Sequence, residues 1–206
     1  MSVYLRPRLP GVPVFFTVCL AQSGSRLLVE EIDILREAVQ VTHARRPFCI
    51  DAWVVLPDHI HAVWTLPLGD PNYSDRWGAI KARFSKFVRL KCQSDVGRRP
   101  GFSPALALPT ELPVVSSGRY AGLKPGLRKD KGECAIWQLR FWEHHIRDEA
   151  DYAAHLRYCW INPVKHGFVS RPADWPFSSI HRDIRLGKVD PEFVADVTDG
   201  QYGEIA

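Results

Sequence analysis

The sequence predicts an α+β sandwich of the ferredoxin-like (RRM-like) kind, a mainly antiparallel sheet with helices covering one face. Two patterns support it: short apolar runs rich in β-branched and aromatic residues alternate with segments whose apolar residues recur every three or four positions. In addition, Pro57-Asp58 is all that separates two of the apolar runs, which predicts a hairpin. The element order, strand, helix, strand, strand, helix, insert, strand, helix, then fits one domain.

The first half of the chain supplies most of the predicted sheet. Residues 14–21, 48–56 and 59–66 are expected to form strands, because each is apolar over the length of a buried strand. Residues 27–44 and 73–91 show the spacing of amphipathic helices. The second of these helices has a basic surface that could face an anion, made by Arg76, Lys81, Arg83, Lys86, Arg89 and Lys91.

A long insert separates the second helix from the rest of the domain. Between residues 92 and 133 the periodicity gives way to Gly, Pro and Ser, so we expect a loop with little regular structure. Residues 135–142 are then expected to return to the sheet, with a further strand at 144–147.

A last helix follows this strand. Asp148 is a suitable N-cap for a helix from Glu149 to about Ile161, and Pro163 is expected to limit it. We therefore expect a single domain over residues 1–182 and a C-terminal tail over 183–206.

Composition restricts the function only loosely. A formal charge of +4 over 206 residues is compatible with a nucleic-acid partner but does not require one. No stretch approaches the roughly 18 apolar residues of a membrane span, and the start lacks the apolar core of a signal peptide, so a cytoplasmic protein is expected. The five cysteines are scattered and never spaced as CxxC, which argues against a disulfide framework and a zinc ribbon.

His59 and His61 are candidate metal ligands. Because side chains alternate along a strand, the two imidazoles project from one face while Ile60 points the other way. A His-x-His-x-His phosphate-transfer site would need a histidine where Val63 stands, and a helical zinc-protease site would need two histidines four residues apart. Two surface histidines on a strand remain the plain alternative.

Tyr158 and Asn162 are four residues apart on the last predicted helix and share one of its faces. The amide oxygen of Asn162 could complete a two-histidine site for Mg²⁺ or Mn²⁺. A phenol with a pKa near 10 needs such a cation nearby to act as a nucleophile at neutral pH. The alternative is a half-buried aromatic residue followed by a polar helix end.

With these residues in place, the chain resembles the REP-associated tyrosine transposases, which belong to the single-tyrosine HUH endonucleases (His, hydrophobic, His). The resemblance runs from about Tyr4 to Arg182 and rests on four ordered motifs. These are IDAWVVLPDHIH (50–61), IWQLRFWEH (136–144), YCWINPVKHG (158–167) and DWPFSS (174–179).

The resemblance implies a metal held by His59, His61 and Asn162, and cleavage of single-stranded DNA by Tyr158 to give a 5′-phosphotyrosine and a free 3′-hydroxyl. It implies no energy cofactor. The substrate would be the hairpin of a repetitive extragenic palindrome (REP), read with a short single-stranded tag at its foot. The enzyme would act as a monomer in the cytoplasm near the nucleoid, with a dimer as the alternative.

Basic residues outside this centre are candidate DNA contacts. In the described motifs and helices these are Arg83, Lys86, Arg140, His144, His145, Arg147 and Lys165. Lys124, Arg128, Lys129 and Lys131 of the insert could also hold phosphates, but a solvated loop explains them equally well.

Two other functions stay open at this point. One is a domesticated nucleic-acid-binding protein that does not cut, and the other is a metal-dependent phosphodiesterase in which water attacks in place of tyrosine. Retention of the histidine pair, the tyrosine and the asparagine argues against the first, and the presence or absence of a protein–DNA adduct separates the second.

Overall fold

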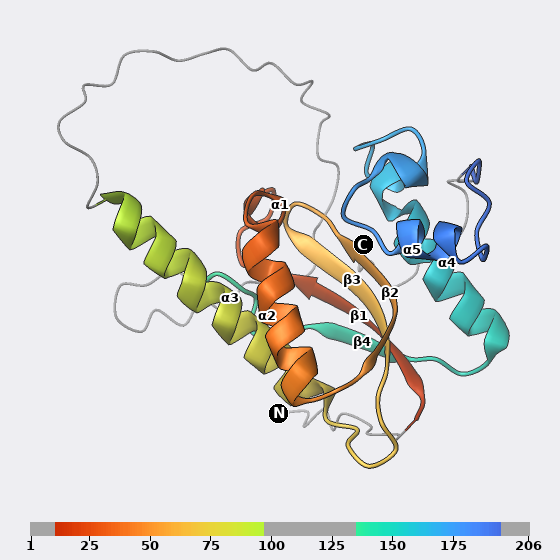
Figure 1. Cartoon of the computed structure of the whole chain (residues 1–206), viewed down its shortest axis with the longest axis horizontal. Helices are drawn as coiled ribbons and strands as arrows, with labels where there is room; N and C mark the ends of the chain where they lie inside the picture. The colour runs from red at the N-terminus through yellow and green to blue at the C-terminus, as the bar shows by residue number, and fades with distance from the viewer. Residues whose placement is uncertain (1–10, 97–134, 195–206) are drawn as a thin grey trace, which may run out of the picture.

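The computed structural model describes residues 11–96 and 135–194, and its centre is a four-stranded antiparallel sheet (Figure 1). The strands are β1 (Pro13–Cys19), β2 (Cys49–Val55), β3 (His59–Thr65) and β4 (Trp142–His145), in the order β2-β3-β1-β4. The predicted hairpin is confirmed: β2 and β3 pair antiparallel, and the Leu56 N–H donates to the His59 carbonyl at 2.8 Å across the turn. The α+β class and the antiparallel sheet are thereby confirmed.

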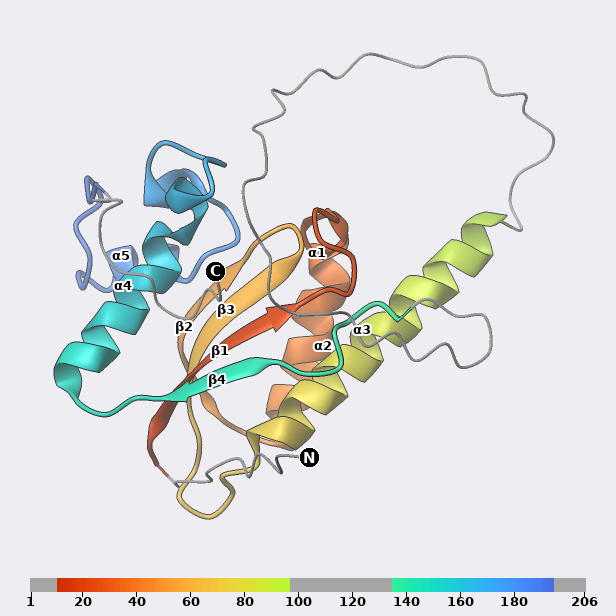
Figure 2. The same cartoon turned by 180° about the vertical axis from the view of Figure 1, so that it is seen from behind.

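Helices cover both faces of the sheet (Figures 1 and 2). One face carries α1 (Leu27–Glu30), α2 (Ile32–Arg45) and α3 (Tyr73–Val96), and α4 (Glu149–Lys165) packs on β2 and β3 from the other. A short 3-10 turn, η1 (Pro172–Asp174), and α5 (Ile180–Arg185) follow α4. The expected one-sided helical layer thus holds for α1 to α3, and α4 adds a second layer.

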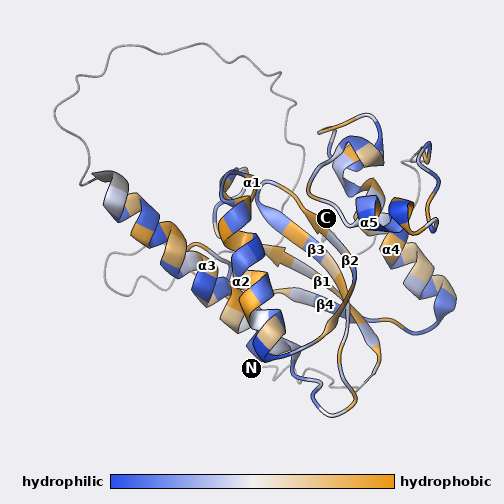
Figure 3. Ribbon diagram, in the orientation of Figure 1, coloured by the Kyte–Doolittle hydropathy of each residue, from blue (hydrophilic) through white to orange (hydrophobic). Residues whose placement is uncertain are grey.

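The second layer follows from the strand sequences. Phe16 and Trp64 point toward α2 and α3, whereas Phe15 and Val63 point toward α4, and all four side chains are buried. Strands that are apolar on both faces need cover on both sides. Figure 3 shows this as hydrophobic stretches in β1 and β3, between helices on which hydrophobic and hydrophilic residues alternate.

Two predicted elements have different bounds in the structure. The helix expected over residues 27–44 is interrupted at Glu31, whose ψ of 35° departs from helical geometry. The strand expected at 144–147 begins two residues earlier and ends at His145, while residues 135–138 join β1 through a single bridge between Leu20 and Trp137. The expected return to the sheet is therefore brief before β4.

The expectation that Pro163 limits the last helix is wrong, because α4 continues to Lys165. A proline removes one N–H, and near the end of a helix that loss is local. Gly167 lies just beyond the C-cap of the helix, and its left-handed φ of +70° turns the chain away from the helix axis. Its N–H donates to the Val164 carbonyl at 2.9 Å, and the Phe168 N–H donates to the Pro163 carbonyl at 2.9 Å, the two bonds of a Schellman motif.

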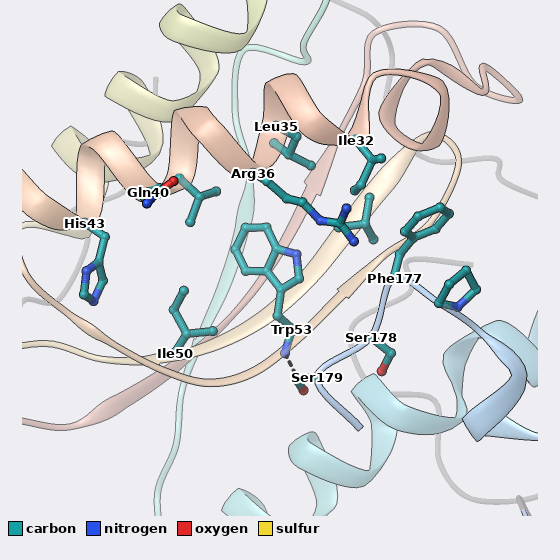
Figure 4. A pocket seen from close by; sticks show the side chains of 13 residues that line it. Ile32, Leu35, Arg36, Gln40, His43, Ile50, Trp53, Phe177, Ser178 and Ser179 are labelled. Carbon is teal, nitrogen blue, oxygen red and sulfur yellow. Dashed lines mark hydrogen bonds between the residues drawn. The ribbon is translucent and has the colours of Figure 1, made fainter. Parts of the chain in front are cut away.

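The segment after α4 returns to the free edge of β2. Ser179 and Trp53 exchange two hydrogen bonds, the Val55 N–H donates to the Phe177 carbonyl at 2.9 Å, and the Trp175 indole donates to the Val55 carbonyl at 2.9 Å. Between this segment and α2 lies an apolar pocket of about 480 Å³, into which Trp53 projects (Figure 4). Trp53 lies in the core on the α2 side of the sheet, so this pocket faces away from the histidine pair.

Some boundaries predicted from the sequence fall at the limits of the described residues. The helix α3 extends to Val96, and the rest of the predicted insert lies outside the described residues. The domain boundary expected at residue 182 falls inside α5, where Asp183 is buried and pairs with Arg182 at 2.9 Å. Among the described residues there is no helix with the length and hydropathy that a membrane crossing requires.

Candidate metal and tyrosine site

The two histidines lie on the α4 face of β3. Their ring centroids are 4.9 Å apart with the planes nearly perpendicular. The His61 residue is 1% exposed, and the His59 side chain is 13% exposed. The predicted shared face is confirmed, and the pair forms one buried end and one accessible end of a site.

Each ring is held by a contact at Nδ1. His59 Nδ1 lies 2.7 Å from Asp58 Oδ1, and His61 Nδ1 lies 3.0 Å from the Thr17 hydroxyl. A ligating imidazole usually uses its second nitrogen in this way, which fixes the tautomer and the orientation of the ring. This leaves Nε2 of each histidine as the nitrogen that could bind a metal ion.

Asp58 is the acidic group nearest the pair. Burial acts to raise the pKa of its carboxyl, but the hydrogen bond with His59 and the 2.7 Å hydrogen bond from the Gly24 N–H lower the pKa below its ordinary value. Asp58 is therefore an ionised partner that favours a cation at His59.

Tyr158 stands directly beside His61. The ring centroids of Tyr158 and His61 are 5.1 Å apart in an edge-to-face arrangement, and Phe15 packs on both rings. Lys165, almost two turns further along α4, places its ammonium 5.0 Å from the centroid of the Tyr158 ring. The predicted convergence of the tyrosine and the histidine pair is therefore present in the fold.

Asn162 is fully buried on α4, one turn beyond Tyr158. Within the described part of the chain, neither its amide oxygen nor its amide nitrogen has a hydrogen-bond partner. A buried polar group without a partner costs about 1–3 kcal/mol, so its presence calls for an explanation such as a bound ion. Two imidazoles and one amide oxygen fit a divalent cation that retains open positions for phosphate oxygens.

Three further residues belong to this site and were missed in the sequence. Asp58 directly precedes the first histidine, so its place in Pro-Asp-His was a usable signal. Thr17 comes from β1 and meets His61 only through the strand register, which no local pattern reveals. His166 packs edge-on against His59 with the centroids 5.2 Å apart, and its position four residues after Asn162 was the available signal.

An aromatic stack supports His166 from behind. Its ring lies parallel to that of Phe168 with the centroids 5.9 Å apart, and Phe168 stacks on Trp175 at 5.3 Å. Because Trp175 donates a hydrogen bond to β2, the stack ties the end of α4 to the sheet beside His59. The DWPFSS motif thus helps to position the site.

A second histidine cluster lies at the start of α4. Asp151 accepts hydrogen bonds from His144 at 2.8 Å and from the Arg147 N–H and guanidinium at 3.1 and 3.0 Å. The Nδ1 of His155 lies 3.1 Å from the other carboxylate oxygen. Burial opposes ionisation of Asp151, but the hydrogen bonds from His144 and Arg147 hold its pKa well below the usual range.

The atoms of His144, Asp151 and His155 are near enough to one another to hold a metal ion. However, N–H donors already occupy this carboxylate, and Arg147 places a positive charge on it. We therefore interpret the cluster as the connection between β4 and α4. The predicted DNA contacts His144 and Arg147 lie in it, although the Arg147 side chain is 74% exposed.

The other predicted DNA contacts are dispersed. Arg83 and Lys86 lie on α3, on the face of the sheet opposite to Tyr158. His145, the last residue of β4, lies beside the ring of Tyr73. Arg140 is exposed before β4, and Lys165 is part of the tyrosine site. Lys124, Arg128, Lys129 and Lys131 lie outside the described residues.

Comparison with known proteins gives close relatives over nearly the full chain, although no family model matches. The chain is 39% identical over 204 residues to a REP-associated tyrosine transposase of Escherichia coli (strain K12), covering 99% of this chain and 98% of the relative. It is 35% identical over 185 residues to a putative REP-associated tyrosine transposase of Haemophilus influenzae, covering 90% and 89% of the two chains.

A solved structure shares the fold as well as the sequence. This chain resembles the structure of a REP-associated tyrosine transposase bound to a REP hairpin, with a TM-score of 0.73 and 39% identity. The match covers 100% of this chain and 99% of that one.

Proposed function

Because this chain belongs to the REP-associated tyrosine transposases, we propose that it cleaves and rejoins single-stranded DNA at the foot of REP hairpins through a covalent bond to Tyr158. The observation that carries the proposal is the contact of the Tyr158 ring with His61, with Asn162 buried one turn along the same helix. This arrangement supports a role for Tyr158 as the nucleophile and for His61 and Asn162 as metal ligands.

The reaction is a transesterification with no net change in the number of phosphodiester bonds. The Tyr158 oxygen loses its proton to solvent and attacks the phosphorus, the bond to the 3′-oxygen breaks, and that oxygen takes up a proton. The products are a 5′-phosphotyrosine and a free 3′-hydroxyl, and attack by a 3′-hydroxyl on the phosphotyrosine reverses the step. No external energy source is needed because one ester replaces another.

The residues of the site have distinct roles in this step. His59, His61 and Asn162 would hold the cation, which we propose to be Mg²⁺ or Mn²⁺, and when bound it neutralises phosphate charge and favours the phenolate. Asp58 and Thr17 orient the two imidazoles. The Lys165 ammonium adds positive charge beside the Tyr158 ring, where negative charge develops on the phenolate.

The test is an adduct assay with a REP-type hairpin oligonucleotide and Mn²⁺. Wild-type protein should yield a DNA-linked species that survives denaturing electrophoresis, and Tyr158→Phe should yield none while still binding the hairpin. Tyr152→Phe is the matched control, because Tyr152 lies on the same helix but burial raises the pKa of its phenol to about 12. An adduct formed equally by Tyr158→Phe would contradict the assignment.

The same gel tests the two alternative functions. A phosphodiesterase that uses water would release a 5′ fragment carrying no protein, and a non-cleaving binding protein would shift the hairpin without cutting it. We propose that the active species is a monomer, with a dimer as the alternative, and that it works in the cytoplasm at the nucleoid. Light scattering of the protein–hairpin complex would measure its stoichiometry.

A further inference from the structure

A groove of about 580 Å³ lies between α3 and the segment that leads into β4. Figure 2 shows this segment running beside α3. One wall is the outer face of α3, which contributes Lys81, Lys86 and Arg89. The opposite side is formed by residues 135–137, including Trp137. This groove is separate from the metal and tyrosine site, since α3 and α4 lie on opposite faces of the sheet.

Among the described residues, the charged side chains that line the groove are all basic. Its lining includes Lys81, Lys86 and Arg89 but no aspartate or glutamate among the described residues. Lys81 is fixed in place: its ammonium donates to the Gln138 carbonyl at 3.1 Å and lies 5.6 Å from the centroid of the Trp137 ring. Basic side chains over an apolar floor suit a sugar–phosphate backbone, which presents charge on one side and apolar carbon on the other.

The position of the groove connects it to the cleavage site. Trp137 bridges to Leu20, and the Leu20 N–H donates to the Asp58 carbonyl at 2.8 Å, directly before His59. Two strand spacings separate Trp137 from Asp58, which is about 10 Å. This separation joins two backbone positions, and it places the groove and His59 at the same end of the sheet.

We propose that this groove, formed by α3 and residues 135–137, holds backbone phosphates of the same DNA at a distance from the phosphate that Tyr158 attacks. This inference rests on the proposed function and adds a second anchor for the substrate. The anchor lies at the end of the sheet where β3 begins. Lys86 and Arg89 would then contact phosphates, and such contacts carry no base specificity.

The test measures hairpin binding by fluorescence anisotropy as a function of salt. The variant is Lys86→Ala/Arg89→Ala, and the matched control is Arg45→Ala/Arg185→Ala, which removes two exposed cations from α2 and α5. The groove variant should bind about tenfold more weakly, with a salt slope lower by about 1.4–1.8, because each lost phosphate contact removes about 0.7–0.9 from it. The control should keep the wild-type affinity and slope. Equal slopes for the wild type and the groove variant would overturn the proposal.

Neutral phosphates locate the contact. Single methylphosphonates are placed at successive positions on both sides of the cleavage position. At the position that the groove contacts, the methylphosphonate should weaken binding of the wild type and have no further effect on the groove variant. Additive effects of the two changes would show that the groove side chains and that phosphate do not meet. Circular dichroism and thermal melting confirm that the variant is folded.

The failure of this inference is distinguishable from failure of the proposed function. The groove variant should still form the Tyr158 adduct when DNA is saturating, and Tyr158→Phe should keep the wild-type salt slope. If the groove variant had a lower salt slope but the wild type formed no adduct, the cleavage mechanism would be wrong and the groove would still be a DNA contact. If the wild type formed the adduct but the groove variant kept the wild-type salt slope, only the DNA contact at the groove would be wrong.

Discussion

At the scale of single residues, each histidine of the site already uses one of its two ring nitrogens in a contact within the protein. His59 contacts Asp58 and His61 contacts Thr17, each through Nδ1, so both rings are oriented before any ion binds. Asn162 differs, because its buried amide has no hydrogen-bond partner among the described residues. The folded protein therefore accepts an energetic cost at Asn162, which the proposed role of its oxygen as a metal ligand explains.

Replacing this amide tests that cost directly. Asn162→Leu has a similar volume and removes the polar atoms, so in metal-free protein we expect the free energy of unfolding to rise by about 1–3 kcal/mol. The same change should weaken Mn²⁺ binding at least tenfold, because it removes a ligand. Urea unfolding in the presence of a chelator and calorimetric titration with Mn²⁺ measure the two effects.

Asn162→Ala is the matched control for packing, because it also removes the amide but leaves a cavity. It should lose Mn²⁺ affinity like Asn162→Leu and lower the free energy of unfolding. If both variants lowered the free energy of unfolding of the metal-free protein equally, the Asn162 amide would have hydrogen-bond partners in solution. The prediction that the two variants change stability in opposite directions would then be wrong.

At the scale of elements, α4 determines where Tyr158 lies, and specific hydrogen bonds define both ends of this helix. The N-cap Asp148 accepts a hydrogen bond from the Asp151 N–H at 2.8 Å, and Asp151 in turn joins β4 through His144. The other end is closed by the Schellman bonds at Gly167. Tyr158 and Asn162 lie between these two fixed points.

The C-terminal end can be tested with a pair of glycines. Gly167→Ala forces a side chain into the left-handed region, although no atom lies within 4 Å of the new Cβ, so we expect a loss of about 1 kcal/mol in unfolding free energy. Gly78→Ala, inside α3 and equally open, should gain about 0.5–1 kcal/mol. Thermal denaturation of the two variants should shift in opposite directions, and parallel shifts would contradict the assigned role of Gly167.

The N-terminal end carries a pH dependence. The folded-state pKa of Asp151 lies below its value of about 3.9 in the unfolded chain, so its stabilising effect is complete above that pH and declines as pH falls toward the folded-state value. Asp151→Asn should cost about 3 kcal/mol at neutral pH, since it leaves Arg147 and His144 without their carboxylate.

Denaturant titrations at several pH values measure this difference. The gap in unfolding free energy between wild type and Asp151→Asn should be constant from pH 7 to about pH 5 and shrink below about pH 4. Asp148→Asn, which keeps a capping oxygen, serves as the control with a small and nearly constant effect. A gap that widened on acidification would have the wrong sign for a carboxylate with a lowered pKa.

At the scale of the whole molecule, the two faces of the sheet differ in their side chains. Aromatic residues including Trp64 and Trp77, whose stacked rings lie 4.2 Å apart, fill the core beneath α2 and α3. The other face holds the histidine pair and Tyr158 under α4. A cation bound there would bridge β3 and α4 and so link two layers of the fold.

Metal binding should therefore stabilise the whole domain. At free Mn²⁺ about 100 times its dissociation constant, unfolding should cost about 2.7 kcal/mol more, which is a rise in Tm of about 5–10 °C that a chelator reverses. His59→Ala should abolish the shift, and His43→Ala, whose imidazole contacts the Phe48 carbonyl, should retain it. If the shift survived His59→Ala and disappeared in His144→Ala, the ion would bind at the Asp151 cluster instead.

The sequence by itself determined the features that depend on local chemistry. Alternation along β3 placed His59 and His61 on one face, and the spacing of four on α4 placed Tyr158 and Asn162 together, because both periodicities are properties of the backbone. The hairpin and the Asp148 cap were also predictable, since turns and caps involve neighbours in the chain. The prediction that Pro163 limits the helix was wrong, because the Schellman motif at Gly167 was the stronger signal for the helix end.

Only the tertiary structure decided which of these faces meet. The contact of Tyr158 with His61, the bond of Thr17 to His61 and the stack behind His166 each join residues distant in the chain, and no local pattern encodes such pairs. The same holds for α4 covering the second face of the sheet, which follows from strands that are apolar on both sides. His59, His61 and Tyr158 lie together because burying that second face packs α4 onto β3.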